Sequence, residues 1–174
     1  MNLTKLFEMQ RELDERIVKE KGLEGKDLLP QKILALQVEL GECANEWRGF
    51  KFWSKDQRPR TNEPFHTVTL YKGESIPDIG YENPLLEEYI DCLHFILSIG
   101  ISLGENEARP QTIYDRSIVD LFSETITWDW KGHYGCGLTV FLELGKELGF
   151  TWEQIEAAYM AKNEVNHNRQ STGY

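Results

Sequence analysis

The stretch EEYIDCLHFILSIGISL, residues 87–103, decides the fold of this chain. Apolar side chains occupy nearly every face of a helix drawn through it, and Pro84 stands where such a helix would begin. A helix that is apolar all round is buried in a protein core or in a membrane. The apolar run from Cys92 to Leu103 is too short for a bilayer span, which takes about 20 residues. We therefore expect a buried central helix.

The rest of the chain supplies helices that could cover this central one. Helical spacing of apolar residues predicts five more helices, at residues 3–17, 30–47, 113–127, 138–148 and from 152 onward. Gly149 stands where a C-terminal cap belongs, and Thr151 with Gln154 forms the capping-box pattern of the last helix. Residues 128–137 are expected to form a turn.

One segment interrupts the helical pattern. Residues 55–84 lack a helical period, and the alternation in FHTVTLY, residues 65–71, indicates a loop or a small hairpin insertion. No composition shift marks a domain boundary. We therefore predict a single all-α domain over residues 1–174, a bundle of about six helices.

The composition excludes some classes of function. The 174 residues include 19 Lys and Arg against 29 Asp and Glu, a net charge of −10. Such a chain is neither a general nucleic-acid binder nor a binder of anionic membranes. Its three cysteines are an odd number, which indicates reduced thiols, and its charged, amphipathic start is not a signal peptide. We expect a cytoplasmic protein.

Carboxylates occur in two pairs beside apolar positions. Glu39 and Glu42 are three residues apart on one predicted helix, and Glu88 and Asp91 are three apart on the central one. Residues at this spacing share a helix face, so each pair can present two oxygen ligands to one point. Hard divalent cations such as Mg²⁺ prefer oxygen ligands. The alternative is a solvated acidic surface. A di-iron bundle is disfavoured, because such bundles use two ExxH motifs and this chain has one, at Glu164.

The last predicted helix changes character along its length. Its inward face begins with apolar residues and continues with Lys162, Asn166 and Arg169, beside Asn163. Cations together with amides suit phosphate oxygens or the edge of a base. The alternative is an ordinary basic helix end that complements the helix dipole.

Three stretches together resemble the dimeric all-α dUTPases of the MazG-like NTP pyrophosphatase superfamily. They are ELGECANEWRGFKFWS at 39–54, EEYIDCLHFILSIG at 87–100 and YMAKNEVNHNRQSTGY at 159–174. The resemblance implies a cytoplasmic homodimer that hydrolyses dUTP, and dUDP as well, to dUMP. It also implies two or more Mg²⁺ ions, for which Mn²⁺ could substitute.

The resemblance also implies roles for single residues. Glu39, Glu42, Glu88 and Asp91 would bind the metal ions. Apart from the resemblance, a carboxylate held by a metal ion can take the proton of water, and we expect Glu42 to do so. The substrate would be bound by residues from four stretches: Gln10 and Asp14, where the family usually has Asn, then Trp53, Lys55, Lys162, Asn163, Asn166, Arg169 and Tyr174.

Two other functions stay open at this point. One is a MazG-like pyrophosphatase for another nucleotide such as dCTP, which a substrate panel would distinguish. The other is a non-enzymatic helical interaction protein with inert acidic pairs. Metal titration would distinguish the last, because a cation that binds only the native state raises its stability.

Overall fold

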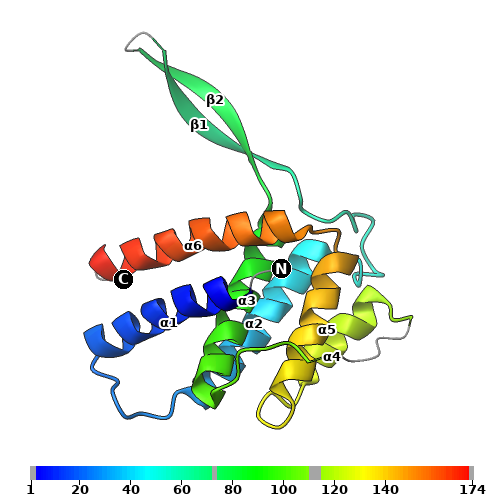
Figure 1. Cartoon of the computed structure of the whole chain (residues 1–174). Helices are drawn as coiled ribbons and strands as arrows, with labels where there is room; N and C mark the ends of the chain where they lie inside the picture. The colour runs from blue at the N-terminus through cyan, green and yellow to red at the C-terminus, as the bar shows by residue number, and fades with distance from the viewer. Residues whose placement is uncertain (1–2, 72–73, 110–114, 173–174) are drawn as a thin grey trace.

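The computed structural model describes residues 3–71, 74–109 and 115–172. Within these ranges the chain forms six helices and one antiparallel pair of strands (Figure 1). In chain order they are α1 (Leu3–Glu20), α2 (Leu29–Trp47), β1 (Glu63–Tyr71), β2 (Glu74–Glu82), α3 (Pro84–Leu103), α4 (Ile118–Thr127), α5 (Tyr134–Glu147) and α6 (Trp152–Thr172). The predicted all-α class is confirmed.

Helix α3 is the centre of the bundle, as its apolar sequence predicted. Its side chains are buried from Leu85 to Gly100 on almost every face, and α1, α2, α5 and α6 all pack against it. The Asn83 side chain caps its first turn, and Gly104 ends it in the left-handed conformation with φ of 72°. These local signals place both ends of α3 where the sequence indicated.

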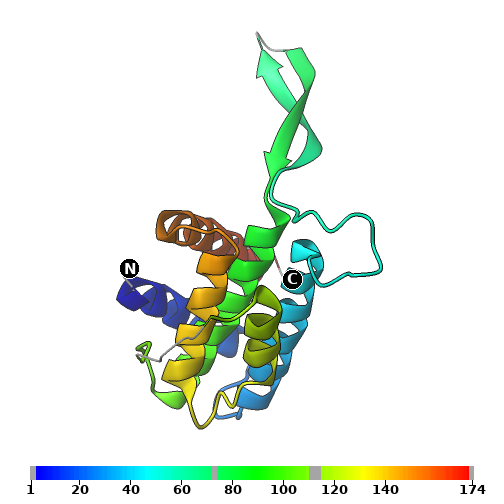
Figure 2. The same cartoon turned by 90° about the vertical axis from the view of Figure 1, so that its right-hand side faces the viewer.

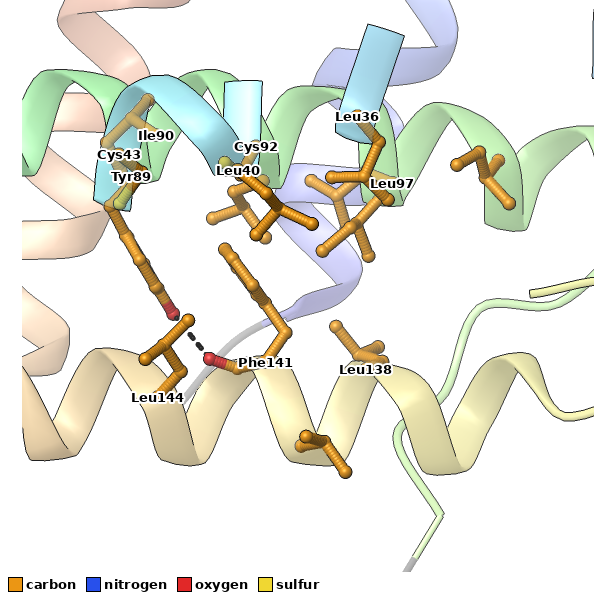
Figure 3. Close-up of a cluster of buried hydrophobic side chains, with 14 of the residues drawn as sticks. Leu36, Leu40, Cys43, Tyr89, Ile90, Cys92, Leu97, Leu138, Phe141 and Leu144 are labelled. Carbon is orange, nitrogen blue, oxygen red and sulfur yellow. Dashed lines mark hydrogen bonds between the residues drawn. The ribbon is translucent and has the colours of Figure 1, made fainter. Parts of the chain in front are cut away.

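The core between α2, α3 and α5 is aromatic as well as aliphatic (Figure 3). Tyr89 of α3 stacks on Phe141 of α5 with ring centroids 4.4 Å apart and donates its hydroxyl hydrogen bond to the Phe141 carbonyl, at 3.2 Å. Leu36 and Leu40 of α2 close the cluster from the other side. Packing of this kind fixes how α2 lies along α3, and this determines where their acidic side chains meet.

Two predicted helix boundaries were wrong. The fourth helix begins at Ile118, because Ser117 and Asp120 form a capping box that stops it there; residues 113 and 114 lie outside the described residues. The fifth begins at Tyr134, four residues before the prediction at Leu138. Its first turn contains Gly137, where a Cβ would lie 2.5 Å from the Trp128 ring, so glycine permits close packing within a helix.

The segment between α2 and α3 carries a longer hairpin than the sequence indicated. Strands β1 and β2 pair over their whole length, from Glu63 opposite Glu82 to Tyr71 opposite Glu74. The hairpin stands away from the helical body in both views (Figures 1 and 2). None of the described helices is long and apolar enough to cross a membrane.

Candidate active site

Three carboxylates from two helices lie together. Glu39 and Glu42 come from neighbouring turns of α2, and Glu88 comes from α3, which packs along it. One carboxylate oxygen from each residue lies within 4.8 Å of the other two. We call these three residues the carboxylate cluster. The structure thus brings together three of the four carboxylates that the two sequence pairs singled out.

The fourth carboxylate, Asp91, forms an ion pair with Lys162 instead. Its Oδ2 accepts a hydrogen bond from Lys162 Nζ of α6 at 2.7 Å. The same ammonium donates to Glu87 Oε1 at 2.8 Å. The side chain of Lys162 is only 12 % exposed, so α6 places a nearly buried positive charge beside the carboxylate cluster.

The carboxylates of the cluster repel one another and are partly buried. Burial, together with the negative charges of Asp91, Glu42 and Glu39, raises the pKa of Glu88 to about 7. Burial also raises the pKa of Glu39, with Asp91 and Glu42 adding to the shift. Carboxylates that repel one another in a partly desolvated place favour a bound cation. Their oxygen donors fit a hard divalent ion.

A cavity of about 260 Å³ begins at these acidic residues. Glu39 and Asp91 line one part of it, so Glu39 belongs both to the cluster and to the cavity wall. Other walls come from α1, α3 and α6, and include the apolar side chains of Leu13, Ile17 and Phe95. The cavity is therefore acidic in one part and apolar in another, as a site for an organic phosphate bound through metal ions would be.

A buried polar network forms another wall of the cavity. Gln10 of α1 is 4 % exposed, and its Oε1 lies 2.7 Å from His94 Nδ1 of α3 and 2.7 Å from the Tyr159 hydroxyl of α6. Gln10 Nε2 donates to Asp14 Oδ1 at 2.7 Å. Asp14 Oδ2 in turn accepts from Ser98 Oγ. We call Gln10, Asp14, His94, Ser98, Tyr159 and Lys32 the Gln10 network.

Lys32 of α2 neutralises the charge of this network. Its Nζ lies 2.9 Å from Asp14 Oδ2 and also donates to the Ser98 carbonyl and the Ser102 hydroxyl. The network therefore joins α1, α2, α3 and α6. Burial, together with the positive charge of Lys162, lowers the pKa of His94 to about 3, so the imidazole is neutral.

The predicted residues of α6 are divided between two places. Asn166 and Arg169 line the cavity, with Arg169 Nη1 3.5 Å from Asn166 Oδ1. Asn163 is buried but is not among the residues that line the cavity. Its Nδ2 has no hydrogen-bond partner within the described residues. The structure thus places two of the four predicted α6 residues at the cavity, because Lys162 does not line it either.

Two predicted substrate contacts, Trp53 and Lys55, lie away from the cavity. Trp53 is 65 % exposed on the segment after α2, where its ring meets Phe50 and Phe52 edge-on. Lys55 is also exposed on that segment. Neither lines the cavity. Tyr174 lies outside the described residues.

Four residues of the Gln10 network give no site signal in the sequence. His94 and Ser98 interrupt an apolar helix, where polar groups are usually satisfied by partners in the core, and no motif singles out Tyr159 or Lys32. Polar residues repeating every four positions on an otherwise apolar helix, at 94, 98 and 102, were the available clue. Ser98 is indeed satisfied, but His94 Nε2 is buried without a partner within the described ranges.

Comparison with known proteins identifies the family. A family described as dUTPase matches residues 2–65 and 78–174, which include all six described helices. Of the unmatched internal stretch, residues 66–77, the described residues 66–71 and 74–77 belong to β1 and β2. A search of the curated proteins finds no match. The chain therefore belongs to the dUTPase family, in its all-α type.

Proposed function

We propose that this chain is a dUTP diphosphatase that also accepts dUDP and forms dUMP by hydrolysis at the α-phosphorus. Family membership supports a hydrolase that acts on nucleoside triphosphates. The observation that carries the proposal is the position of Glu39, which belongs both to the carboxylate cluster and to the cavity wall. Phosphates bound at the cluster would leave the nucleoside in the cavity.

The carboxylate cluster would hold the metal ions. Glu39, Glu42 and Glu88 would supply oxygen ligands, and the neighbouring Asp91 would supply a fourth. We propose two or more Mg²⁺ ions, with Mn²⁺ as a substitute. When bound, these ions supply the positive charge that lets an acidic site accept a polyphosphate and stabilise the charge of the transition state.

Protein groups perform the proton and charge transfers of the reaction. Glu42 is the exposed member of the cluster, so its carboxylate is open to water and takes the proton of the attacking molecule. The water oxygen bonds to the α-phosphorus while the bond to the bridging oxygen breaks. Lys162 and Arg169 then stabilise the negative charge that develops on the leaving phosphates, pyrophosphate in the case of dUTP.

The Gln10 network would hold the base. Phe95, Leu13 and Ile17 offer apolar surface for a flat ring, and the network offers hydrogen-bonding groups for its edge. A pyrimidine placed there lies away from the carboxylate cluster, in keeping with a nucleotide that spans the cavity.

The test is a substrate panel with matched variants. The protein is incubated with Mg²⁺ and each deoxynucleoside triphosphate, and monophosphate and pyrophosphate are quantified. We expect dUTP to be preferred, and Glu42→Gln to lower kcat about 1000-fold or more, because it removes a metal ligand and the base together. Preference for dCTP would reassign the substrate, and no turnover of any nucleotide would reject the proposal.

Glu46→Gln is the matched control for this variant. Glu46 lies one turn further along α2 and is not part of the carboxylate cluster. The same charge is removed from the same helix, so the control should retain activity within about twofold of the unaltered protein. An equal loss in both variants would show that net charge, not the cluster, controls turnover.

We also propose that the chain forms a homodimer through α2. The apolar face of α3 is buried within the chain, whereas Leu34 and Val38, one turn apart on α2, are 62 % and 51 % exposed. Such a stripe suits a second copy of the chain. Sedimentation equilibrium should show that the unaltered protein is a dimer. The double variant Leu34→Glu with Val38→Glu should be a monomer. An unaltered protein that is monomeric at micromolar concentration would contradict this interface.

A further inference from the structure

Lys162 of α6 lies between two carboxylates of α3. Its Nζ donates to Asp91 Oδ2 at 2.7 Å and to Glu87 Oε1 at 2.8 Å. Glu87 and Asp91 are four residues apart, so α3 presents them on one face, one turn apart. Burial lowers the pKa of Lys162, but the hydrogen bonds to Asp91 and Glu87 outweigh it and raise the pKa, so the group is an ammonium. One positive charge is thus shared by two carboxylates.

The two carboxylates have different surroundings. The side chain of Asp91 is 21 % exposed and lines the cavity beside Glu39. The side chain of Glu87 is 55 % exposed and lines a separate groove of about 340 Å³ between α3 and α6. Lys162 lines this groove as well, and Glu87 is not a member of the carboxylate cluster. One partner of Lys162 therefore belongs to the candidate site, and the other lies outside it.

A metal ion at the carboxylate cluster would draw on Asp91 as well. Burial and then the charge of Asp91 raise the pKa of Glu39 and of Glu88, so Asp91 lies within electrostatic reach of the cluster. A divalent ion held by Asp91 takes up the negative charge that pairs with the ammonium, and the two cations repel each other. Glu87 is free of this competition, because it lies outside the cluster.

We propose that Glu87 is a positioning residue: it holds Lys162 beside the site while Asp91 binds the metal ion, so that the ammonium and the metal ion do not compete for one carboxylate. The proposal rests on the proposed function for the metal ion and the phosphates. An ammonium carries three hydrogens, and two of them are directed at Glu87 and Asp91. The hydrogen that leaves Asp91 and the third hydrogen are then both available to the oxygens of a leaving phosphate.

Mn²⁺ binding in the absence of nucleotide tests this role. Electron paramagnetic resonance measures free Mn²⁺, and a titration gives the Mn²⁺ concentration that half-saturates the protein. In Glu87→Gln the ammonium keeps Asp91 as its remaining carboxylate among the described partners, so we expect this concentration to rise about tenfold. Lys162→Gln removes the competing cation, and in that background Glu87→Gln should raise the concentration about twofold at most.

A matched control separates positioning from net charge. Glu46→Gln removes the same charge from α2 and leaves both carboxylate partners of Lys162 in place, so its half-saturating concentration should stay within about twofold of that of the unaltered protein. Circular dichroism checks that each variant is folded before Mn²⁺ is added. Lys162→Met, which also lacks the charge, takes the place of Lys162→Gln if the latter does not fold.

An equal rise of the half-saturating concentration in both backgrounds would overturn the proposal, because Glu87 would then act through its charge alone. So would a Glu87→Gln protein that binds Mn²⁺ like the unaltered one, or an unaltered protein that binds no Mn²⁺ at millimolar concentration. The expected pattern without hydrolysis of dUTP would reject the proposed function and leave the role of Glu87 standing. Hydrolysis of dUTP with equal rises in both backgrounds would reject the role of Glu87 and leave the proposed function standing.

Discussion

The two polar regions of the cavity are built in opposite ways. At the carboxylate cluster, like charges from α2 and α3 face one another, and burial raises the pKa of Glu88 to about 7. In the Gln10 network, the single carboxylate of Asp14 is matched by Lys32, and nearly every donor has an acceptor. The first region leaves its like charges without a protein cation between them in the described residues, as the proposed metal site requires, whereas the second is almost complete within the protein.

The two regions therefore differ in how they affect the free energy of unfolding. Unpaired like charges oppose folding of the metal-free chain, and a cation that binds there returns that free energy. A satisfied buried network stabilises the fold and at the same time holds side chains in one orientation. Removing charge should therefore have opposite effects on stability in the two regions.

The largest change in the free energy of unfolding is expected from a substitution that breaks the Gln10 network. Asp14→Ala leaves Lys32 and the Gln10 amide without their carboxylate in a nearly buried place, and should lower the free energy of unfolding by about 3 kcal/mol. Urea titration followed by circular dichroism measures it. Glu12→Ala, an exposed change on the same helix, should stay within about 0.5 kcal/mol. Equal losses would mean that the network does not stabilise the fold.

A smaller change is expected when Mg²⁺ binds the carboxylate cluster, and it should raise the free energy of unfolding. At ten times its Kd, an ion that binds only the folded chain adds about 1.4 kcal/mol to the free energy of unfolding. Thermal melts with MgCl₂, compared with KCl of equal ionic strength, measure the gain. Glu88→Gln should reduce it and Glu46→Gln should not. An unchanged melting temperature with Mg²⁺ would argue against a metal site.

The smallest effect is the pH dependence of the metal-free protein. Because the pKa of Glu88 rises from 4.5 to about 7 on folding, its protonation favours the folded state. That contribution is complete below pH 4.5 and is lost as the pH rises through 7. Allowing for solvent screening, we expect a loss of about 1 kcal/mol between pH 5 and pH 8. Glu88→Gln should remove this loss, and an unaltered pH profile in that variant would assign it to other groups.

Local patterns predicted the helices well and the hairpin poorly. The capping box of Thr151 and Gln154 is formed, with both hydrogen bonds present, because it depends on residues four positions apart at most. The second strand was missed because Pro77 and Gly80 interrupt its pattern. In a hairpin of two strands every strand is an edge, so a proline opposite Val68 can be tolerated.

The site divides in the same manner. The spacing within each pair, Glu39 with Glu42 and Glu88 with Asp91, sufficed to predict a shared helix face. Glu39, Glu42 and Glu88 came together once α2 packed on α3. The pairing of Asp91 with Lys162, 71 positions away, had no sequence signal. Nor did the exposed place of Trp53, which a motif match alone had assigned to the substrate.

The sequence by itself determined the helices, the central position of α3 and the faces that carry the acidic pairs, because these depend on periodicity within a few turns. Only the tertiary structure decided that Gln10 meets His94, 84 positions away, and Tyr159, 149 positions away, at 2.7 Å each. Hydrogen bonds between helices require atoms to agree within tenths of an ångström, and the packing of whole helices controls that agreement.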